Sequence, residues 1–140
     1  MMFSFVIKRL YFLCNFPFAS AFFDCLLKIY CVFINHKLID IQDEIEKEVN
    51  DWPDIESKMH KFGGVEFILH GNEIGHIHSN GLLDILFTKE IKHKLLFDGQ
   101  ISNHHRFPKS GWISFYIKSE KDKGVALSLL RYSYQQSLLL

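Results

Sequence analysis

Apolar side chains recur every three or four positions over residues 38–52, with acidic and basic residues between them. This spacing predicts an amphipathic helix, which Pro53 would end. Residues 54–61 are mostly polar and show no such spacing, so they predict a connection or a short helix.

Three short runs that follow are typical of β-strands, at residues 64–70, 73–78 and 82–88. Gly71-Asn72 lies between the first two runs and predicts a two-residue hairpin turn. Residues 79–81, Ser-Asn-Gly, predict a turn before the third run. The three runs therefore predict consecutive antiparallel strands.

The last third of the chain predicts a helix, a strand and a second helix. Residues 89–98 are helical in pattern, and residues 112–118 alternate strictly between two faces, as a strand does. Ser119 followed by Asp122 resembles a capping box, which predicts a helix from there to about Tyr134. That helix is apolar nearly all round, so we expect it to be largely buried.

The order of these elements predicts the fold class. Helices followed by β-β-β-α-β-α indicate an α+β domain, in which helices cover a mainly antiparallel sheet. We assign residues 37–140 to this domain and residues 1–36 to an apolar N-terminal helical segment. A chain of 140 residues is long enough to bury one core.

The N-terminal segment leaves three interpretations open. Its longest uncharged run, Leu10–Phe23, is shorter than the ~20 apolar residues of a membrane-spanning helix, and Pro17 interrupts it. It fits helices that pack on the sheet or lie in a membrane interface, with Asp24 and Lys28 paired on an exposed strip. A membrane anchor and a cleaved signal are the other two readings.

Charge and cysteine usage exclude several classes of protein. The chain has 16 basic and 16 acidic residues in mixed order, so we expect no nucleic-acid partner. Its three cysteines form no CxxC pair, which argues against zinc ribbons and disulfide frameworks. P-loop, nucleophile-elbow, Rossmann and HExxH motifs are absent from the sequence. We expect a cytoplasmic protein, with residues 1–34 as the part that would contact a membrane surface.

The most chemically suggestive stretch contains His76 and His78. Residues two apart on a strand share one face, roughly 7 Å apart along it. Such a pair fits hydrogen-bonded strand residues, a catalytic or substrate-binding pair, or a metal centre. No tight spacing indicates a third metal ligand, so we assign none; the residues that could supply one are His104, His105, Asp84 and Glu66.

Glu66 is the hardest residue to explain as structure, because apolar neighbours flank it. Such a carboxylate needs a partner or a raised pKa, as a general base does. If Gly71-Asn72 forms the turn, Phe67 pairs with His76 and Glu66 points away from the histidines. A one-residue bulge would bring Glu66 onto their face.

Four segments resemble the luciferase-domain family: residues 52–55, 62–87, 103–117 and 129–134. Together they cover about residues 50–136 in order. The bacterial members of this family are mostly uncharacterised small proteins. Its characterised branch is the fungal luciferase, which adds molecular oxygen to 3-hydroxyhispidin and emits light.

The resemblance implies an oxygenase-like pocket without a cofactor, in which molecular oxygen attacks a small aromatic or pyrone-like compound. One of the histidines would be the base, a glutamate would set its tautomer, and Trp112 would form a wall of the pocket. The residues expected in catalysis are His76, His78, His105 and Glu66, and those expected to bind substrate are Glu73, Asp84, His104, Trp112 and Tyr134. A non-catalytic ligand-binding domain and a metal-dependent hydrolase using the two strand histidines stay open as alternatives.

Overall fold

A computed structural model describes residues 19–61, 63–97, 99 and 101–139 of the chain. It contains, in order along the chain, α2 (Ala19–Asn50), β1 (Ile55–Met59), β2 (Val65–Leu69), β3 (Asn72–Ile77), β4 (Leu82–Leu86), α3 (Lys89–Leu96), β5 (Ser102–Asn103), β6 (Trp112–Tyr116) and α4 (Glu120–Ser137). This confirms the α+β class.

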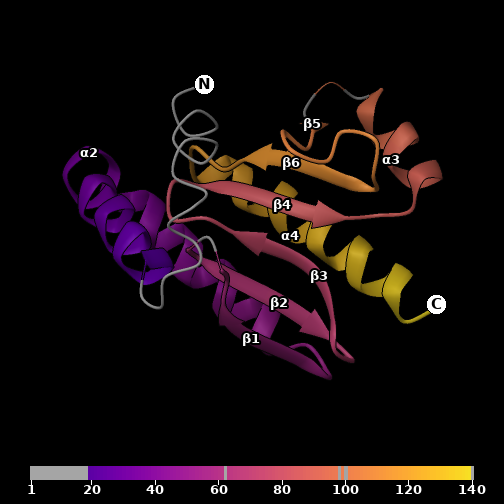
Figure 1. The fold of residues 1–140 in the computed structure, drawn as a ribbon, viewed down its shortest axis with the longest axis horizontal. Coiled ribbons are helices and arrows are strands. Elements are labelled where there is room, and N and C mark those ends of the chain that lie inside the picture. Colours follow the sequence, from indigo (N-terminus) through magenta and orange to yellow (C-terminus); the bar gives the residue numbers. More distant parts are fainter. Residues whose placement is uncertain (1–18, 62, 98, 100, 140) are drawn as a thin grey trace.

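The strands form one six-stranded sheet in the order β1-β2-β3-β4-β6-β5, and all neighbouring pairs are antiparallel. α2 and α4 lie behind this sheet in Figure 1. Their apolar side chains form the core with one face of the sheet. The opposite face carries the polar residues of the central strands.

The amphipathic pattern that predicted a helix from residue 38 is confirmed, although α2 begins earlier, at Ala19. Its buried side chains recur at the predicted spacing, at Leu38, Ile41, Ile45 and Val49. The predicted break at Pro17 falls outside the described residues, as do the side chains of Asp24 and Lys28. No helix in the described part of the chain is long and apolar enough to cross a membrane.

Residues 54–61 are mainly a strand, β1, where the sequence predicted a connection or a short helix. β1 lies at the edge of the sheet and pairs only with β2 among the described strands. An edge strand is exposed to water on much of its surface, so it carries polar residues, such as Glu56 and Lys58, where a central strand would be apolar. Because of this polar composition, the sequence did not predict the strand.

The helix predicted after Ser119 is present as α4, and Ser119 and Asp122 form its capping box. It is less buried than predicted. One face packs on the sheet through Ala126, Leu129, Leu130, Ser133 and Tyr134. Tyr132 and Ser128 point to solvent on the other side.

The hairpin between β2 and β3 differs from its predicted register. Its turn consists of His70 and Gly71, which both have positive φ, and Leu69 pairs with Asn72. The register then shifts between Phe67 and Ile68, which is a β-bulge. The prediction that Phe67 pairs with His76 is therefore wrong.

Candidate functional site

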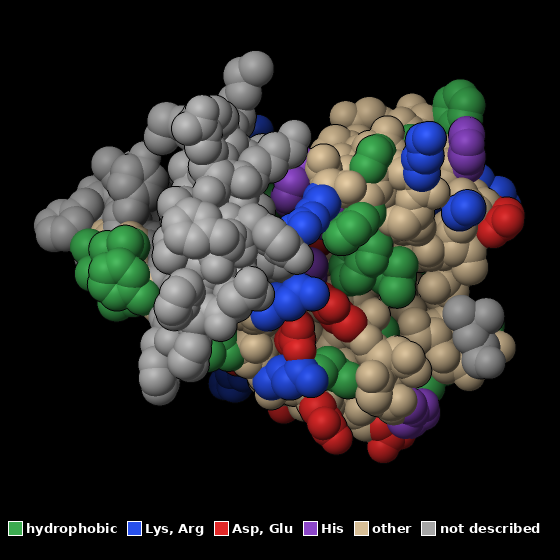
Figure 2. Space-filling view, in the orientation of Figure 1, with side chains coloured by type: hydrophobic (Ala, Val, Ile, Leu, Met, Phe, Trp, Pro, Cys, Tyr) green, Lys and Arg blue, Asp and Glu red, His purple; other side chains and the backbone are tan. Residues whose placement is uncertain are grey.

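A row of polar residues crosses the open face of the sheet, one from each strand. The paired positions are Lys58 on β1, Glu66 on β2, His76 on β3, Asp84 on β4, Ser114 on β6 and Ser102 on β5. In an antiparallel sheet directly paired residues point to the same side. Figure 2 looks onto this side and shows acidic, basic and histidine side chains gathered in its middle.

A cavity of about 280 Å³ opens over this row. Five histidines, two carboxylates, two aromatic side chains and two cationic side chains line it: His60, His76, His78, His104, His105, Glu73, Asp84, Phe107, Trp112, Lys61 and Arg106. Ligand pockets typically measure about 300–1,000 Å³, so the cavity suits a small ligand.

Asp84 is the centre of the cluster and is fully buried. Its Oδ1 accepts a hydrogen bond from the Ser114 hydroxyl. Its Oδ2 lies 3.4 Å from His76 Nε2, 3.5 Å from His104 Nε2 and 3.7 Å from His78 Nε2. Burial opposes the ionised carboxyl, but the three histidines outweigh burial and hold the pKa of Asp84 well below its usual range. Asp84 is therefore an anion.

His76 lies between two carboxylates. Its Nδ1 is 2.5 Å from Glu73 Oε1, and its Nε2 faces Asp84. Burial disfavours the charged ring, but Asp84 and Glu73 outweigh this effect and raise the pKa of His76 to about 8. In the arrangement described, the ring is an imidazolium at neutral pH.

His78 follows β3 directly and is also buried. Its Nδ1 donates to the carbonyl oxygen of Gly63 at 3.2 Å, which directs Nε2 toward Asp84. Burial, reinforced by the charge of His76, lowers the pKa of His78 even though Asp84 opposes the shift. His78 is therefore a neutral ring with its proton on Nδ1.

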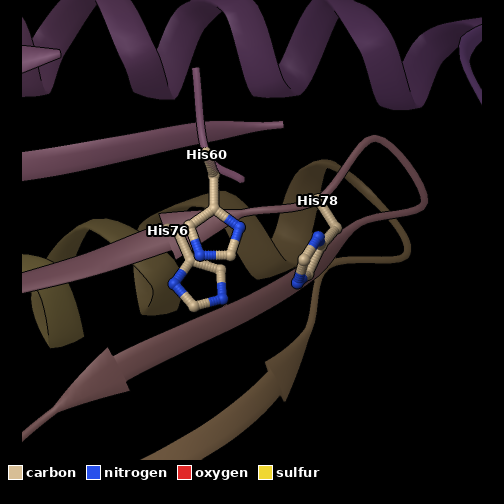
Figure 3. Close-up of side chains that lie close together, drawn as sticks. All are labelled: His60, His76 and His78. Atoms are coloured by element: carbon tan, nitrogen blue, oxygen red, sulfur yellow. The ribbon is translucent and has the colours of Figure 1, made fainter. Parts of the chain in front are cut away.

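His60 lies in the loop after β1 and lines the cavity. Figure 3 shows its ring next to that of His76. Its ring stacks on His76 with centroids 3.9 Å apart and planes within 10°. Burial, reinforced by the charge of His76, lowers the pKa of His60 to about 2. Gly64 makes this loop possible, because a Cβ there would lie 1.9 Å from the Ile77 carbonyl oxygen.

Sequence reasoning missed His60, because residues 54–61 predicted a connection with no site. Its signal was present in the alternation of residues 55–60 and the glycine pair Gly63-Gly64, which together indicate a hairpin. A hairpin would have placed His60 next to β3.

The loop between β5 and β6 supplies His104 and His105. The backbone N–H groups of Arg106 and Phe107 both donate to His104 Nδ1, at 3.1 Å each. The lone pair of Nδ1 is thereby used, so the proton of the neutral ring is on Nε2, which faces Asp84. His105 stacks on His104 at 4.5 Å and is half-buried. Burial lowers the pKa of His105.

Lys92 of α3 holds the end of the same loop. Its buried ammonium group donates to the carbonyl oxygens of Pro108, Ser110 and Trp112 at 2.8, 2.8 and 2.9 Å. The Trp112 ring then stands 5.4 Å from the His76 ring and forms a wall of the cavity. A residue remote from the cavity thus fixes the position of its wall.

Seven of the nine site residues expected from the sequence line one cavity: His76, His78, His104, His105, Glu73, Asp84 and Trp112. Glu66 stands beside it, opposite His76, where its carboxylate lies 3.4 Å from Lys58 Nζ. The structure does not bring Tyr134 to this cavity. Tyr134 packs on Trp52 in the core, and its hydroxyl donates to the Pro53 carbonyl oxygen.

Comparison with known proteins bears on the chain's family. The family model of the Luciferase domain matches residues 71–133, which confirms the resemblance seen in the sequence. This segment contains β3, β4, β6 and most of the cavity's histidines. No curated protein and no solved structure matches the chain.

Proposed function

We propose that the protein, whose residues 71–133 match the family model of the Luciferase domain, is an oxygenase. Its substrate would be a small aromatic or pyrone-like compound with an acidic enol or phenol hydroxyl. The observation that carries this proposal is one cavity lined by four histidines of the matched segment, three of which lie within 3.7 Å of a buried carboxylate.

The reaction begins with removal of the hydroxyl proton by a base. The substrate anion then gives two electrons to molecular oxygen as a carbon–oxygen bond forms, and the resulting peroxide takes up the proton from the base. Substrate and oxygen thus sum to a hydroperoxide. Because the substrate supplies both electrons, the reaction needs no organic cofactor.

We assign the role of base to His105. It lines the cavity and is only half-buried, so a bound substrate can reach it. Its lowered pKa keeps the ring neutral at pH 7, as a base must be. His76 and His104 are less suited, because both ring nitrogens of each already face polar partners.

The other cavity residues suit an aromatic anion. Trp112 and Phe107 offer flat surfaces on which a ring can stack. Lys61 and Arg106 place positive charge on the lining, where it favours the ionised form of the substrate. These features support binding of a planar, acidic compound over that of a neutral aliphatic one.

The test measures oxygen consumption and binding separately. Purified protein is mixed with a panel of 4-hydroxy-2-pyrones and polyhydroxylated phenols, while an oxygen electrode follows uptake and tryptophan fluorescence follows binding. For a substrate that is consumed, His105→Gln is expected to slow uptake about 100-fold or more with little change in binding. The control is His70→Asn, because His70 is exposed on the hairpin turn.

Binding without oxygen uptake by any compound would favour the ligand-binding alternative. If no compound of the panel binds and none is consumed with oxygen, the proposal is overturned. Uptake that His105→Gln leaves unchanged would refute the assigned base.

A further inference from the structure

We propose that the floor of the cavity is a binding site for a divalent transition-metal ion, held by His76 Nε2, His78 Nε2 and Asp84 Oδ2. This inference goes beyond the proposed oxygenase and does not depend on it. It also departs from the expectation, drawn from the family resemblance, of a site without a cofactor.

The two distances from the Asp84 carboxylate to the histidine nitrogens are close to those of a coordination shell. Asp84 Oδ2 lies 3.4 Å from His76 Nε2 and 3.7 Å from His78 Nε2. With metal–ligand bonds of about 2.1 Å, neighbouring ligand atoms stand about 3.0 Å apart in an octahedral shell and about 3.4 Å apart in a tetrahedral one. Both contacts of Asp84 thus lie within about 0.7 Å of the spacing in such a shell.

Asp84 Oδ2 itself points to a missing partner. It is buried, and among the described residues no group makes a hydrogen bond of good geometry to it. Its contacts with the three histidines, at 3.4–3.7 Å, are too long for strong hydrogen bonds, so they compensate the charge of this buried oxygen only in part. A cation between it and the two imidazoles would satisfy all three atoms.

The far nitrogen of each proposed histidine ligand is already occupied. His76 Nδ1 contacts the Glu73 carboxylate, and His78 Nδ1 donates to the Gly63 carbonyl oxygen. Metal-binding histidines almost always have such a second partner, which fixes the ring and leaves the other nitrogen for the metal. The charge of the site also suits a divalent ion. Once His76 has lost its extra proton, the two negative charges of Asp84 and Glu73 balance the two positive charges of the ion.

Two neighbouring histidines do not fit as ligands. His104 uses the lone pair of Nδ1 for two backbone N–H groups, so its Nε2 carries a proton and cannot bind a metal. The His60 ring is parallel to the His76 ring at 3.9 Å, so the in-plane lone pairs of the two rings do not meet at one point. His60 instead covers the face of the His76 ring, as Figure 3 shows.

Two histidines and one carboxylate, with further positions open to a cavity, form the ligand set typical of non-haem Fe(II) oxygenases. The same donors bind Co²⁺, Mn²⁺ and Zn²⁺, so the ligand class is a first-row divalent metal ion. Such an ion would place a Lewis acid where the substrate enters.

The experiment uses untagged full-length protein, stripped with EDTA and titrated with Co²⁺ in the absence of substrate. Calorimetry gives the stoichiometry, and the visible absorption of Co²⁺ reports nitrogen coordination. We expect one equivalent in the wild type, no stoichiometric binding after Asp84→Asn or His78→Ala, and an unchanged affinity after His70→Asn. Circular dichroism establishes that each variant is folded.

Glu73→Gln is the second variant, because Glu73 is partly exposed and its replacement is mild. It is not one of the proposed ligands and orients the ligand His76, so we expect Co²⁺ to bind about 10–100-fold more weakly. This result keeps the proposal testable if the buried substitutions prevent folding.

Failure of the wild type to bind Co²⁺, Mn²⁺ or Zn²⁺ stoichiometrically would overturn the proposal. Binding that survives Asp84→Asn but is lost after His60→Ala would overturn the ligand set, in favour of the grouped nitrogens of His60, His76 and His78. Because no substrate is present, neither outcome depends on the oxygenase proposal. Oxygen uptake by metal-free protein would support that proposal and show that this ion is not needed for it.

Discussion

Glu66 stands directly opposite His76 in the register of β2 and β3, on the open face of the sheet. A regular hairpin would place these two side chains on opposite faces. The turn also lies one residue earlier than predicted, but this moves each residue of β2 to a partner two positions away on β3, which points to the same face. Only the bulge therefore accounts for the pairing of Glu66 with His76. One extra residue therefore places Glu66 beside the histidine cluster.

Gly75 is required where β3, β4 and α4 meet. A Cβ there would lie 3.0 Å from the Asp84 carbonyl oxygen and 3.2 Å from Leu130. We expect Gly75→Ala to lower the free energy of unfolding by about 1–3 kcal/mol, measured by urea denaturation.

Gly124 of α4 is the matched control, because no atom lies within 4 Å of the place a Cβ would take. We expect Gly124→Ala to raise the free energy of unfolding by about 0.5–1 kcal/mol, through helix propensity. Equal effects of the two substitutions would mean that Gly75 is not tightly packed.

The capping box of α4 predicts a pH-dependent stability. The backbone N–H groups of Lys118 and Ser119 donate to the Asp122 carboxylate and lower its pKa below the usual 3.8. A depressed folded pKa contributes stability above the unfolded pKa and loses it as pH falls through the folded value. We expect Asp122→Ala to cost about 1 kcal/mol at pH 7, as a lost cap does.

That difference from the wild type should shrink steadily below about pH 4, near the unfolded pKa of aspartate. Urea denaturation of both proteins between pH 3 and 7 measures it. A difference that stays constant over this range would show that the charge of Asp122 contributes nothing.

Lys92 should be a determinant of stability, because its ammonium group satisfies three backbone carbonyls. We expect Lys92→Met to lower the free energy of unfolding by about 2–3 kcal/mol, since three charged hydrogen bonds are lost and the carbonyls lose their donor. Amide hydrogen exchange over residues 104–112 should also become faster. Lys94→Met, on the exposed side of the same helix, should change neither quantity.

The structural role of His104 in its loop should be retained by any residue that can accept the same two backbone hydrogen bonds. The side-chain oxygen of asparagine can accept from the N–H groups of Arg106 and Phe107, as His104 Nδ1 does. We therefore expect slow amide exchange at both residues to persist in His104→Asn and to be lost in His104→Ala. Similar exchange in the two variants would mean that the loop is held by other contacts.

Tyr134 should matter for stability and not for the cavity, because its hydroxyl donates to Pro53 on the core side of the sheet. We expect Tyr134→Phe to cost about 0.5–1.5 kcal/mol, the net value of one hydrogen bond. Ligand binding and Co²⁺ binding should stay at wild-type levels. A weakened ligand affinity would restore the substrate contact expected from the sequence.

The periodicity of the chain by itself determined the main elements and the fold class. The alternation of residues 112–118 correctly places Ile113 and Phe115 in the core and Ser114 on the open face. The spacing in residues 38–50 likewise indicates the buried face of α2. Such patterns can be read from sequence because each element must bury one face, whatever it packs against.

Only the tertiary structure decided which polar residues meet. His60, His78, Asp84 and His104 lie on four separate segments, and their convergence depends on strand order, on the bulge and on loops fixed by distant groups such as Lys92. Tyr134 was expected to bind substrate, but its position on α4 turns its side chain into the core. The sequence does not distinguish these two orientations. Local patterns report which side of an element is buried, whereas the neighbours of a polar side chain depend on contacts between residues far apart in the chain.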